Sequence, residues 1–357
     1  MNSDINAGVI EGFFGRPWGW PARLGSAEFL RDNGFGFYIY APKAEAFLRR
    51  RWREPLPADS MQHLSQLAGQ CRKLGICFGI GLTPFEIYLN YDSSAQSLLR
   101  SKVRQINEIG ADLLCILFDD MRGDIHGLAE LQSKVILDVC SWSTAERFIA
   151  CPTYYSYDAR LAREFGPPPK AYLRDLGRSV DARIDFFWTG EKIISDGYPA
   201  EHLSDVAAAI GRRPFIWDNH IANDSRTRTS HLYLDPAAGS WRLPADQVAG
   251  LAINPMNQPH LSRIALLGYR RLLATAAPAE RRQALREICT SLCGQPLAQH
   301  LLQDIGLLQD AGIAELDGET RRRLLDFYAA ETSDPYAQEI AAWLRGEYAF
   351  DPQCLTS

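Results

Sequence analysis

The sequence predicts a (β/α)8 barrel followed by a small all-helical region. Short apolar runs alternate with segments of helical periodicity, the alternation gives eight strands over roughly 270 residues, and strand patterns then stop. A doubly wound open sheet is the alternative α/β architecture, but the strand count and the lack of a glycine-rich phosphate loop weigh against it. We therefore assign residues 1–274 to the barrel and residues 275–357 to a small helical domain that packs on it.

The predicted strands are short apolar runs, several of them bounded by Gly or Pro, as expected for buried parallel strands. They cover residues 8–14, 35–41, 76–82, 113–118, 147–151, 184–188, 214–217 and 251–253. The segments between them carry apolar residues on one stripe, and Gly75 and Gly110 stand where helix C-termini are expected. These predicted helices cover residues 22–33, 59–74, 93–109, 128–143, 170–178, 200–210 and 259–274.

The region from Thr275 onward has a different character, because strand patterns are absent and amphipathic stripes dominate. The periodicity predicts four helices, over residues 280–293, 298–311, 318–329 and 335–347. We expect these helices to pack against the barrel. A homodimer contact through them is a further expectation.

The bulk composition excludes several classes of function. A net charge of −5 gives no electrostatic case for nucleic acid or an anionic membrane as a partner. No run approaches the roughly 18 apolar residues of a membrane span, and the N-terminus shows no signal-peptide pattern. The eight cysteines form no CxxC pair, which suits reduced thiols and a cytoplasmic location. The seven histidines lack metal-ligand spacing, so we expect neither a metal nor another cofactor.

Two adjacent carboxylates, Asp119 and Asp120, end the apolar run within Leu113–Asp124. Acids at the end of a buried strand are costly unless they are used or satisfied. Taken alone, such a pair is most often structural, with one acid capping the next helix and the other meeting a surface cation. The surrounding strand ends therefore decide between a structural and a catalytic role.

Polar and aromatic residues follow most of the predicted strands. Active sites of (β/α)8 barrels are built at the C-terminal ends of the strands, so these residues are expected at one mouth. Each has an ordinary alternative role as core, turn or solvated residue, but together they suit a sugar: aromatic faces for pyranose surfaces, amides and carboxylates for hydroxyls, and an acid pair for the bond. They are Glu11, Gly12, Lys43, Asp119, Asp120, Tyr154, Tyr155, Trp188, Thr189, Trp217, Asp218, Asn219, Asn254 and, from the loop over residues 219–246, Asn223 and Asp224.

These segments resemble glycoside hydrolase family 84, the β-N-acetylglucosaminidases that include O-GlcNAcases and bacterial relatives once called hyaluronidases. The resemblance covers the whole predicted barrel and is specific, because seven segments occur in family order. They are GVIEGFFGRPW (8–18), YIYAPK (38–43), LFDDM (117–121), CPTYY (151–155), FWTG (187–190), IWDNHIANDS (216–225) and INPMNQ (253–258). The helical region carries no motif that can be placed in the same way.

The resemblance implies substrate-assisted, retaining hydrolysis of a terminal β-linked N-acetylhexosamine, an exception to the usual two-carboxylate scheme. The acetamide oxygen of the substrate would attack the anomeric carbon and form an oxazoline. By the match, Asp119 would orient the acetamide N–H, and Asp120 would protonate the leaving oxygen and later activate water. Both acids can reach one sugar only if the backbone turns where the strand ends, since adjacent strand residues point to opposite faces.

The resemblance also implies a set of substrate-binding residues. Tyr155 would hydrogen-bond the acetamide oxygen, Trp217 would wall the methyl pocket, and Asn219 would support the acetamide. Asp224 would bind O4 and O6, which selects a terminal sugar. The remaining hydroxyls would be held by Lys43, Asn254 and the backbone of Gly12.

Two departures from the family pattern leave the aglycone open. Tyr154 stands where many relatives have an acid, and the third strand ends in TPFEIY instead of a glycine-bearing segment. Two other functions are compatible with the sequence. One is a metal-dependent hydrolase with Asp119, Asp120 and Asp124 as oxygen ligands, and the other is an inactive barrel that binds aminosugar glycans.

Overall fold

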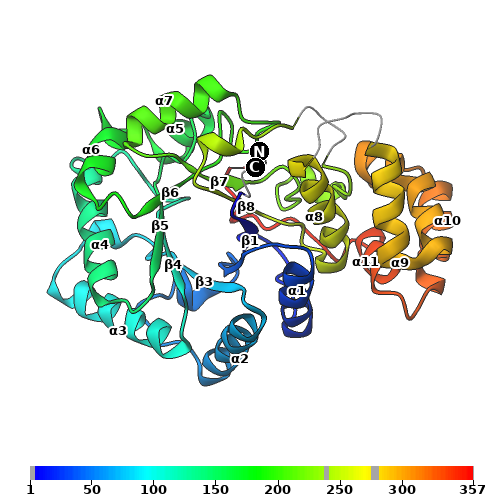
Figure 1. Cartoon of the computed structure of the whole chain (residues 1–357), viewed down its shortest axis with the longest axis horizontal. Coiled ribbons are helices and arrows are strands. Elements are labelled where there is room, and N and C mark those ends of the chain that lie inside the picture. Colours follow the sequence, from blue (N-terminus) through cyan, green and yellow to red (C-terminus); the bar gives the residue numbers. More distant parts are fainter. Residues whose placement is uncertain (1–4, 237–240, 275–280, 357) are drawn as a thin grey trace.

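The computed structural model describes residues 5–236, 241–274 and 281–356. Its centre is a closed barrel of eight parallel strands in chain order, which confirms the predicted fold class (Figure 1). Each strand pairs with the next one along the chain, and the last pairs with the first. The strands are β1 (Ala7–Glu11), β2 (Phe37–Tyr40), β3 (Cys77–Leu82), β4 (Leu113–Leu117), β5 (Arg147–Cys151), β6 (Asp185–Trp188), β7 (Phe215–Asp218) and β8 (Gly250–Ile253).

Eight helices of the barrel domain surround this sheet (Figure 1). Gly75 and Gly110 end their helices in the left-handed conformation, at φ 71° and 83°, as the sequence predicted. These helices are α1 (Trp20–Asp32), α2 (Ala58–Leu74), α3 (Ser93–Ile109), α4 (Leu128–Trp142), α5 (Ala159–Phe165), α6 (Tyr172–Ser179), α7 (Ala200–Ile210) and α8 (Pro259–Ala274).

Two local predictions were wrong for simple reasons. The first strand ends at Glu11, three residues before the apolar run ends, because Phe13 and Phe14 already belong to the turn that enters the site. The short helix α5 was not predicted, because its seven residues are too few for a clear stripe. Asp158 caps it by accepting a hydrogen bond from the Arg160 amide at 2.9 Å.

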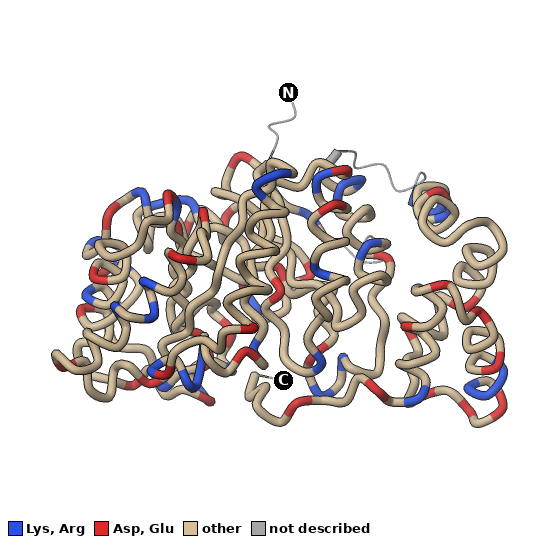
Figure 2. Tube along the Cα trace, turned by 90° about the horizontal axis from the view of Figure 1, so that it is seen from below, with Lys and Arg blue, Asp and Glu red and all other residues tan. Residues whose placement is uncertain are grey.

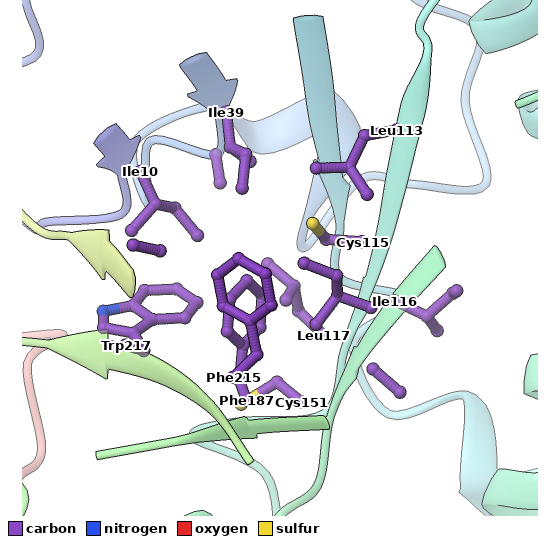
Figure 3. Packing of buried hydrophobic residues seen from close by; sticks show 14 of the residues in the cluster. Ile10, Ile39, Leu113, Cys115, Ile116, Leu117, Cys151, Phe187, Phe215 and Trp217 are labelled. Carbon is purple, nitrogen blue, oxygen red and sulfur yellow. The ribbon is translucent and has the colours of Figure 1, made fainter. Parts of the chain in front are cut away.

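Aromatic side chains fill the centre of the barrel (Figure 3). The ring of Phe187 lies 5.6 Å from that of Phe215 and 5.1 Å from that of Trp217, in edge-to-face geometry. Such pairs add about 0.5–1.5 kcal/mol each beyond the burial of their area. The core thus holds one side of the Trp217 ring in place, and its other side faces the mouth of the barrel.

The helical region contains α9 (Arg281–Ile305), a π-helical turn (Gly306–Ala311), α10 (Gly318–Ala330) and α11 (Pro335–Leu344). Its hydrophobic cluster, which includes Leu301, Tyr328 and Trp343, is shared with Leu261 and Ile264 of α8. The Glu339 carboxylate accepts hydrogen bonds from the His260 and Leu261 amides at the start of α8, which ties this region to the barrel. The domain boundary predicted at Thr275 lies outside the described residues.

The chain does not stop at the helical region. After α11 it turns at Gly346 and runs back across the molecule, so that its last described residues lie at the middle of the barrel (Figures 1 and 2). Among the described residues, no helix is long and apolar enough to cross a membrane.

Candidate active site

A cavity opens at the C-terminal ends of the barrel strands. The structure brings to its wall all nine residues to which the family resemblance assigns a role, and also the predicted Thr189. These nine come from six different strand ends or the loops that follow them, which is the arrangement expected of a (β/α)8 barrel site. The nine are Gly12, Lys43, Asp119, Asp120, Tyr155, Trp217, Asn219, Asp224 and Asn254. Their placement together does not by itself fix their roles.

A backbone turn brings the two adjacent acids into the same cavity. Strand β4 ends at Leu117, and Asp120 has a left-handed φ of 57°. This conformation costs a non-glycine residue on the order of 1–2 kcal/mol, and such strain is found where function requires it. Asp119 and Asp120 therefore face the same space, as the sequence argument required, and each is only 6% exposed.

Lys43 lies between the acids and pairs with one of them. Its ammonium donates a hydrogen bond to Oδ2 of Asp119 and lies 4.0 Å from Oδ2 of Asp120. Burial lowers the pKa of Lys43, but the two carboxylates outweigh burial and hold it above the usual value. The second oxygen of Asp119, Oδ1, is buried and has no hydrogen-bond partner among the described residues.

Asp120 is in a different electrostatic position from its neighbour. Burial raises its pKa to about 6, and the charge of Asp119 acts in the same direction, while Lys43 and Arg49 oppose the rise. The Tyr155 hydroxyl donates a hydrogen bond to Oδ1 of Asp120 at 3.5 Å. The site thus holds one carboxyl that keeps its proton up to about pH 6 beside one that is paired with a lysine, an arrangement suited to proton transfer.

Two amide side chains form the opposite wall, and hydrogen bonds fix their orientation. Oδ1 of Asn219 accepts from the Trp217 indole N–H and from Nδ2 of Asn254, both at 2.9 Å. Oδ1 of Asn254 in turn accepts from the Gly12 amide at 3.1 Å. A Cβ atom on Gly12 would lie only 2.3 Å from the Trp217 ring, so a side chain at this position would displace that ring.

Asp224 comes from the long loop after β7. Its Oδ2 accepts a hydrogen bond from the Phe14 amide at 2.8 Å, which joins this loop to the loop after β1. Burial raises its pKa, and the Phe14 amide partly opposes this effect. One carboxylate oxygen is thus committed to the protein while the residue still lines the cavity.

Five residues predicted at the mouth serve the scaffold instead. Glu11 pairs with Arg23 in a buried ion pair at 2.7 Å, and Trp188 donates to His202 at 2.9 Å. Tyr154 donates its hydroxyl to the Gly166 carbonyl at 2.7 Å. Asp218 accepts from the Trp241 indole, and Asn223 donates to Gln258. Residue type and strand-end position do not reveal which neighbour a side chain will find.

Several residues that line the cavity were not predicted from the sequence. Apolar positions such as Phe14, Cys151, Ile193 and Ile194 carry no chemical signal, although two of the four lie inside the matched segments. Two more residues come from the far end of the chain, and no local pattern indicated that this end returns to the barrel. They are Cys354 and Thr356.

The geometry required by the metal hypothesis does not occur in the described part of the chain. Asp124 is held by Arg122 outside the cavity, with its Oδ2 3.2 Å from Nη2 of that arginine. Within the described ranges, no group of three or more His, Cys, Asp or Glu side chains is arranged to hold a metal ion.

A parallel barrel that presents a proton-carrying acid, a second carboxylate and sugar-compatible amides in one cavity defines a glycoside hydrolase. Comparison with known proteins identifies the family. The sequence model of the family described as beta-N-acetylglucosaminidase matches residues 7–304. The chain therefore belongs to the β-N-acetylglucosaminidase family, which confirms the resemblance seen in its motifs.

Individual relatives agree with this assignment. The O-GlcNAcases of Mus musculus and Rattus norvegicus are each 29% identical to the chain over 257 residues, which is 70% of this chain but only 28% of either relative. A mutant of the Thermobaculum terrenum O-GlcNAc hydrolase has a TM-score of 0.77 at 25% identity, covering 98% of this chain and 82% of that one. The structure of CpGH84B has a TM-score of 0.71 at 21% identity, and the match covers 92% of this chain and 58% of that one. At this identity the likeness shows the fold alone.

Proposed function

We propose that the protein is a retaining exo-β-N-acetylglucosaminidase that uses the substrate's own acetamide as its nucleophile. The observation that carries this proposal is the difference between the two acids. Asp119 keeps a buried oxygen without a hydrogen-bond partner among the described residues, and the raised pKa of Asp120, about 6, lets it carry a proton at mildly acidic pH. A buried acceptor without a donor is costly, and the acetamide N–H of a bound aminosugar is a donor of the right kind.

In the first step, the acetamide N–H donates to Oδ1 of Asp119, which makes the acetamide oxygen more nucleophilic. This oxygen forms a bond to the anomeric carbon while the bond from that carbon to the leaving oxygen breaks. Asp120 delivers its proton to the leaving oxygen, so that the aglycone departs as a neutral alcohol. The product is a bound oxazoline, whose developing positive charge lies beside the Asp119 carboxylate.

In the second step, Asp120 is a carboxylate and accepts a proton from water. The oxygen of this water bonds to the anomeric carbon, the bond to the acetamide oxygen breaks, and the acetamide is restored. Two inversions at one carbon give net retention. The Tyr155 hydroxyl, which lies beside Asp120, would turn to donate to the acetamide oxygen, and the Trp217 face would be the apolar wall for the acetamide methyl group.

The remaining polar groups account for binding of the sugar ring. Asp224 and Asn254 offer acceptors and donors for hydroxyls, and Lys43 retains donors that Asp119 does not use. One carboxylate oxygen of Asp224 accepts a hydrogen bond from the Phe14 amide, which fixes this side chain as a wall on one side of the cavity. A closed side next to O4 and O6 excludes a further sugar there and favours action on a terminal residue.

The natural substrate class is also part of the proposal. The named relatives are O-GlcNAcases or O-GlcNAc hydrolases, so protein-linked N-acetylglucosamine is the first candidate. The chain spans only 28% of the mouse and rat proteins, and their other regions have no counterpart in this match. A cytoplasmic location, the lack of a nucleic-acid or membrane partner, and a homodimer through the helical region stay predictions.

The test compares Asp119→Asn and Asp120→Asn on two β-N-acetylglucosaminides, one with an activated aryl leaving group and one with a simple alkyl leaving group. We expect Asp120→Asn to lower kcat/KM on the alkyl glycoside by about 10²–10⁴-fold and much less on the aryl glycoside, which needs no proton. Asp119→Asn should lower both, because it acts on oxazoline formation. Asp124→Asn is the matched control and should leave both rates unchanged.

Full activity of Asp120→Asn on the alkyl glycoside would refute the proposed acid. A large loss in Asp124→Asn that chelation reproduces in the parent would instead favour the metal hypothesis. Tight binding of aminosugars without turnover in the parent protein would identify a glycan-binding barrel.

A further inference from the structure

The chain supplies a segment of its own to the mouth of the candidate active site. After α11, residues 345–356, here called the return segment, leave the helical region and reach the barrel (Figures 1 and 2). Cys354 and Thr356 line the same cavity as the two acids and are themselves buried. The return segment lies outside residues 7–304, over which the family model matches.

The end of the return segment, here called its tip, lies next to side chains that have a role in the proposed mechanism. The Thr356 side chain is near enough to the Tyr155 hydroxyl and to the Cys354 thiol to oppose the rise in the pKa of both groups. The Cys354 thiol is close enough to Asp224 and Asp120 for both carboxylates to raise its pKa, in addition to burial. The tip thus lies across the cavity from the sugar-binding side to the proton-transfer side.

The space that remains is too small for a sugar. The cavity has a volume of about 60 Å³, whereas an enclosed cavity that holds one benzene ring measures about 150 Å³. The barrel walls are held by the core and by the amide network, as at Trp217 and Asn219. The return segment is the wall with the least support, so it is the wall expected to move.

Apart from the buried Cys354 and Thr356, the contacts of the return segment lie largely near the surface. They include the exposed Arg16–Glu347 ion pair at 3.3 Å and the partly buried Tyr348. The Arg226 guanidinium stacks on the Phe350 ring at 4.8 Å, and that of Arg16 stacks on the Tyr348 ring at 5.2 Å. Near the tip, Nη1 of Arg160 donates to the Thr356 carbonyl at 3.3 Å. Segments with few buried contacts open at small free-energy cost.

A hinge is present at the start of the return segment. Gly346 has a left-handed φ of 81° directly after α11, and its amide donates to the Trp343 carbonyl at 2.9 Å. No atom lies within 4 Å of where its Cβ would be. The helix therefore ends at a left-handed glycine, and the chain changes direction there.

We propose that the return segment is a displaceable plug of the substrate cavity, which an aminosugar substrate must push out in order to bind. This inference rests on the proposed function for the identity of the ligand, but not for the movement itself. Because only the open form is competent to bind, the apparent affinity is reduced by the fraction of molecules that are open. Loosening the plug should therefore tighten binding of a substrate analogue without any change at the acids.

The experiment follows alkylation of Cys354 by iodoacetamide in the full chain, read by mass spectrometry of the peptide that contains it. In the closed form this thiol is buried and should react slowly. Phe350→Ala removes the ring that stacks on Arg226 and should speed labelling roughly tenfold without any ligand. Phe350→Tyr keeps the ring and should label at the parent rate. A saturating thiazoline analogue of N-acetylglucosamine should also speed labelling in the parent, because it displaces the tip.

Activity and binding are measured on the same three proteins. Phe350→Ala should lower KM for an aryl N-acetylglucosaminide with little change in kcat, while Phe350→Tyr should not. Equal labelling in Phe350→Ala and the parent, or slower labelling when the thiazoline is bound, would overturn the plug. If Phe350→Ala labels faster than the parent, but none of the three proteins binds or hydrolyses aminosugars, the plug is supported and the proposed function is refuted.

Discussion

Replacement of Asp120 by Asn should stabilise the fold, and only where the native carboxyl is ionised. The side chain is buried and its pKa is raised to about 6, against about 3.9 in an unfolded chain. Between these values the native state holds a proton that the unfolded state has lost. The stability contributed by this group is therefore fully present at low pH and falls as pH rises from about 4 to about 6.

The size of the effect follows from the difference between the two pKa values. About two pKa units correspond to about 3 kcal/mol at 1.36 kcal/mol per unit. This is the free energy by which ionised Asp120 destabilises the native state at pH 7–8, after the favourable effect of Lys43 is included. Asn has a similar shape and no charge, so Asp120→Asn should regain about 2–3 kcal/mol at pH 8 and nothing near pH 4.

Urea unfolding of the parent and the variant at pH 4 and pH 8 measures this directly. The difference between the two proteins at each pH removes the pH dependence of all other groups. Asp124→Asn is the control of opposite sign, because the hydrogen bond from Arg122 lowers the pKa of Asp124. An Asp120→Asn variant that is equally or less stable than the parent at pH 8 would show that ionisation of Asp120 does not destabilise the native state.

Three further outcomes are expected. The kcat/KM for an alkyl N-acetylglucosaminide should fall as pH rises above about 6, since Asp120 must be protonated in the free enzyme; a flat profile to pH 8 would contradict this. Gly12→Ala should lose about 1–3 kcal/mol in urea unfolding and at least tenfold in kcat/KM, because its Cβ would displace the Trp217 ring, and wild-type values would exclude the clash. Arg23→Met should destabilise the protein by about 3–5 kcal/mol by leaving buried Glu11 unpaired, and a loss below 1 kcal/mol would mean that Glu11 finds another partner.

The barrel was predictable because its signals are local and repeated. Each apolar run before a turn, such as the one ending at Asp119, reports a strand by its own composition. Closure into a barrel follows from the count and the alternation. Helix ends at Gly75 and Gly110 were predictable for the same reason, since a left-handed residue is required there.

The site was predictable only in part. The sequence placed Asp119 and Asp120 at the mouth, and the left-handed turn at Asp120 is the local feature that makes them face one cavity. Glu11 shows the limit, since it stands at a strand end like the others but lies within reach of Arg23. Partners distant in the sequence decide such cases.

The return segment shows the limit most clearly. Cys354 and Thr356 reach the cavity from 100 and 102 residues beyond the last predicted site residue, Asn254. Nothing in their composition marks them as cavity residues, because the contact depends on where α11 ends and how the chain leaves Gly346. Only a three-dimensional structure could reveal it.

The central claim is that the substrate's acetamide is the nucleophile. It is tested most directly by comparing kcat/KM for matched aryl β-glycosides of N-acetylglucosamine, glucosamine and glucose under one set of conditions. The account predicts hydrolysis of the N-acetylglucosaminide and a loss of several orders of magnitude for both sugars that lack the acetyl group. Comparable rates on the plain glucoside would show that a protein group attacks the anomeric carbon, and would contradict the account.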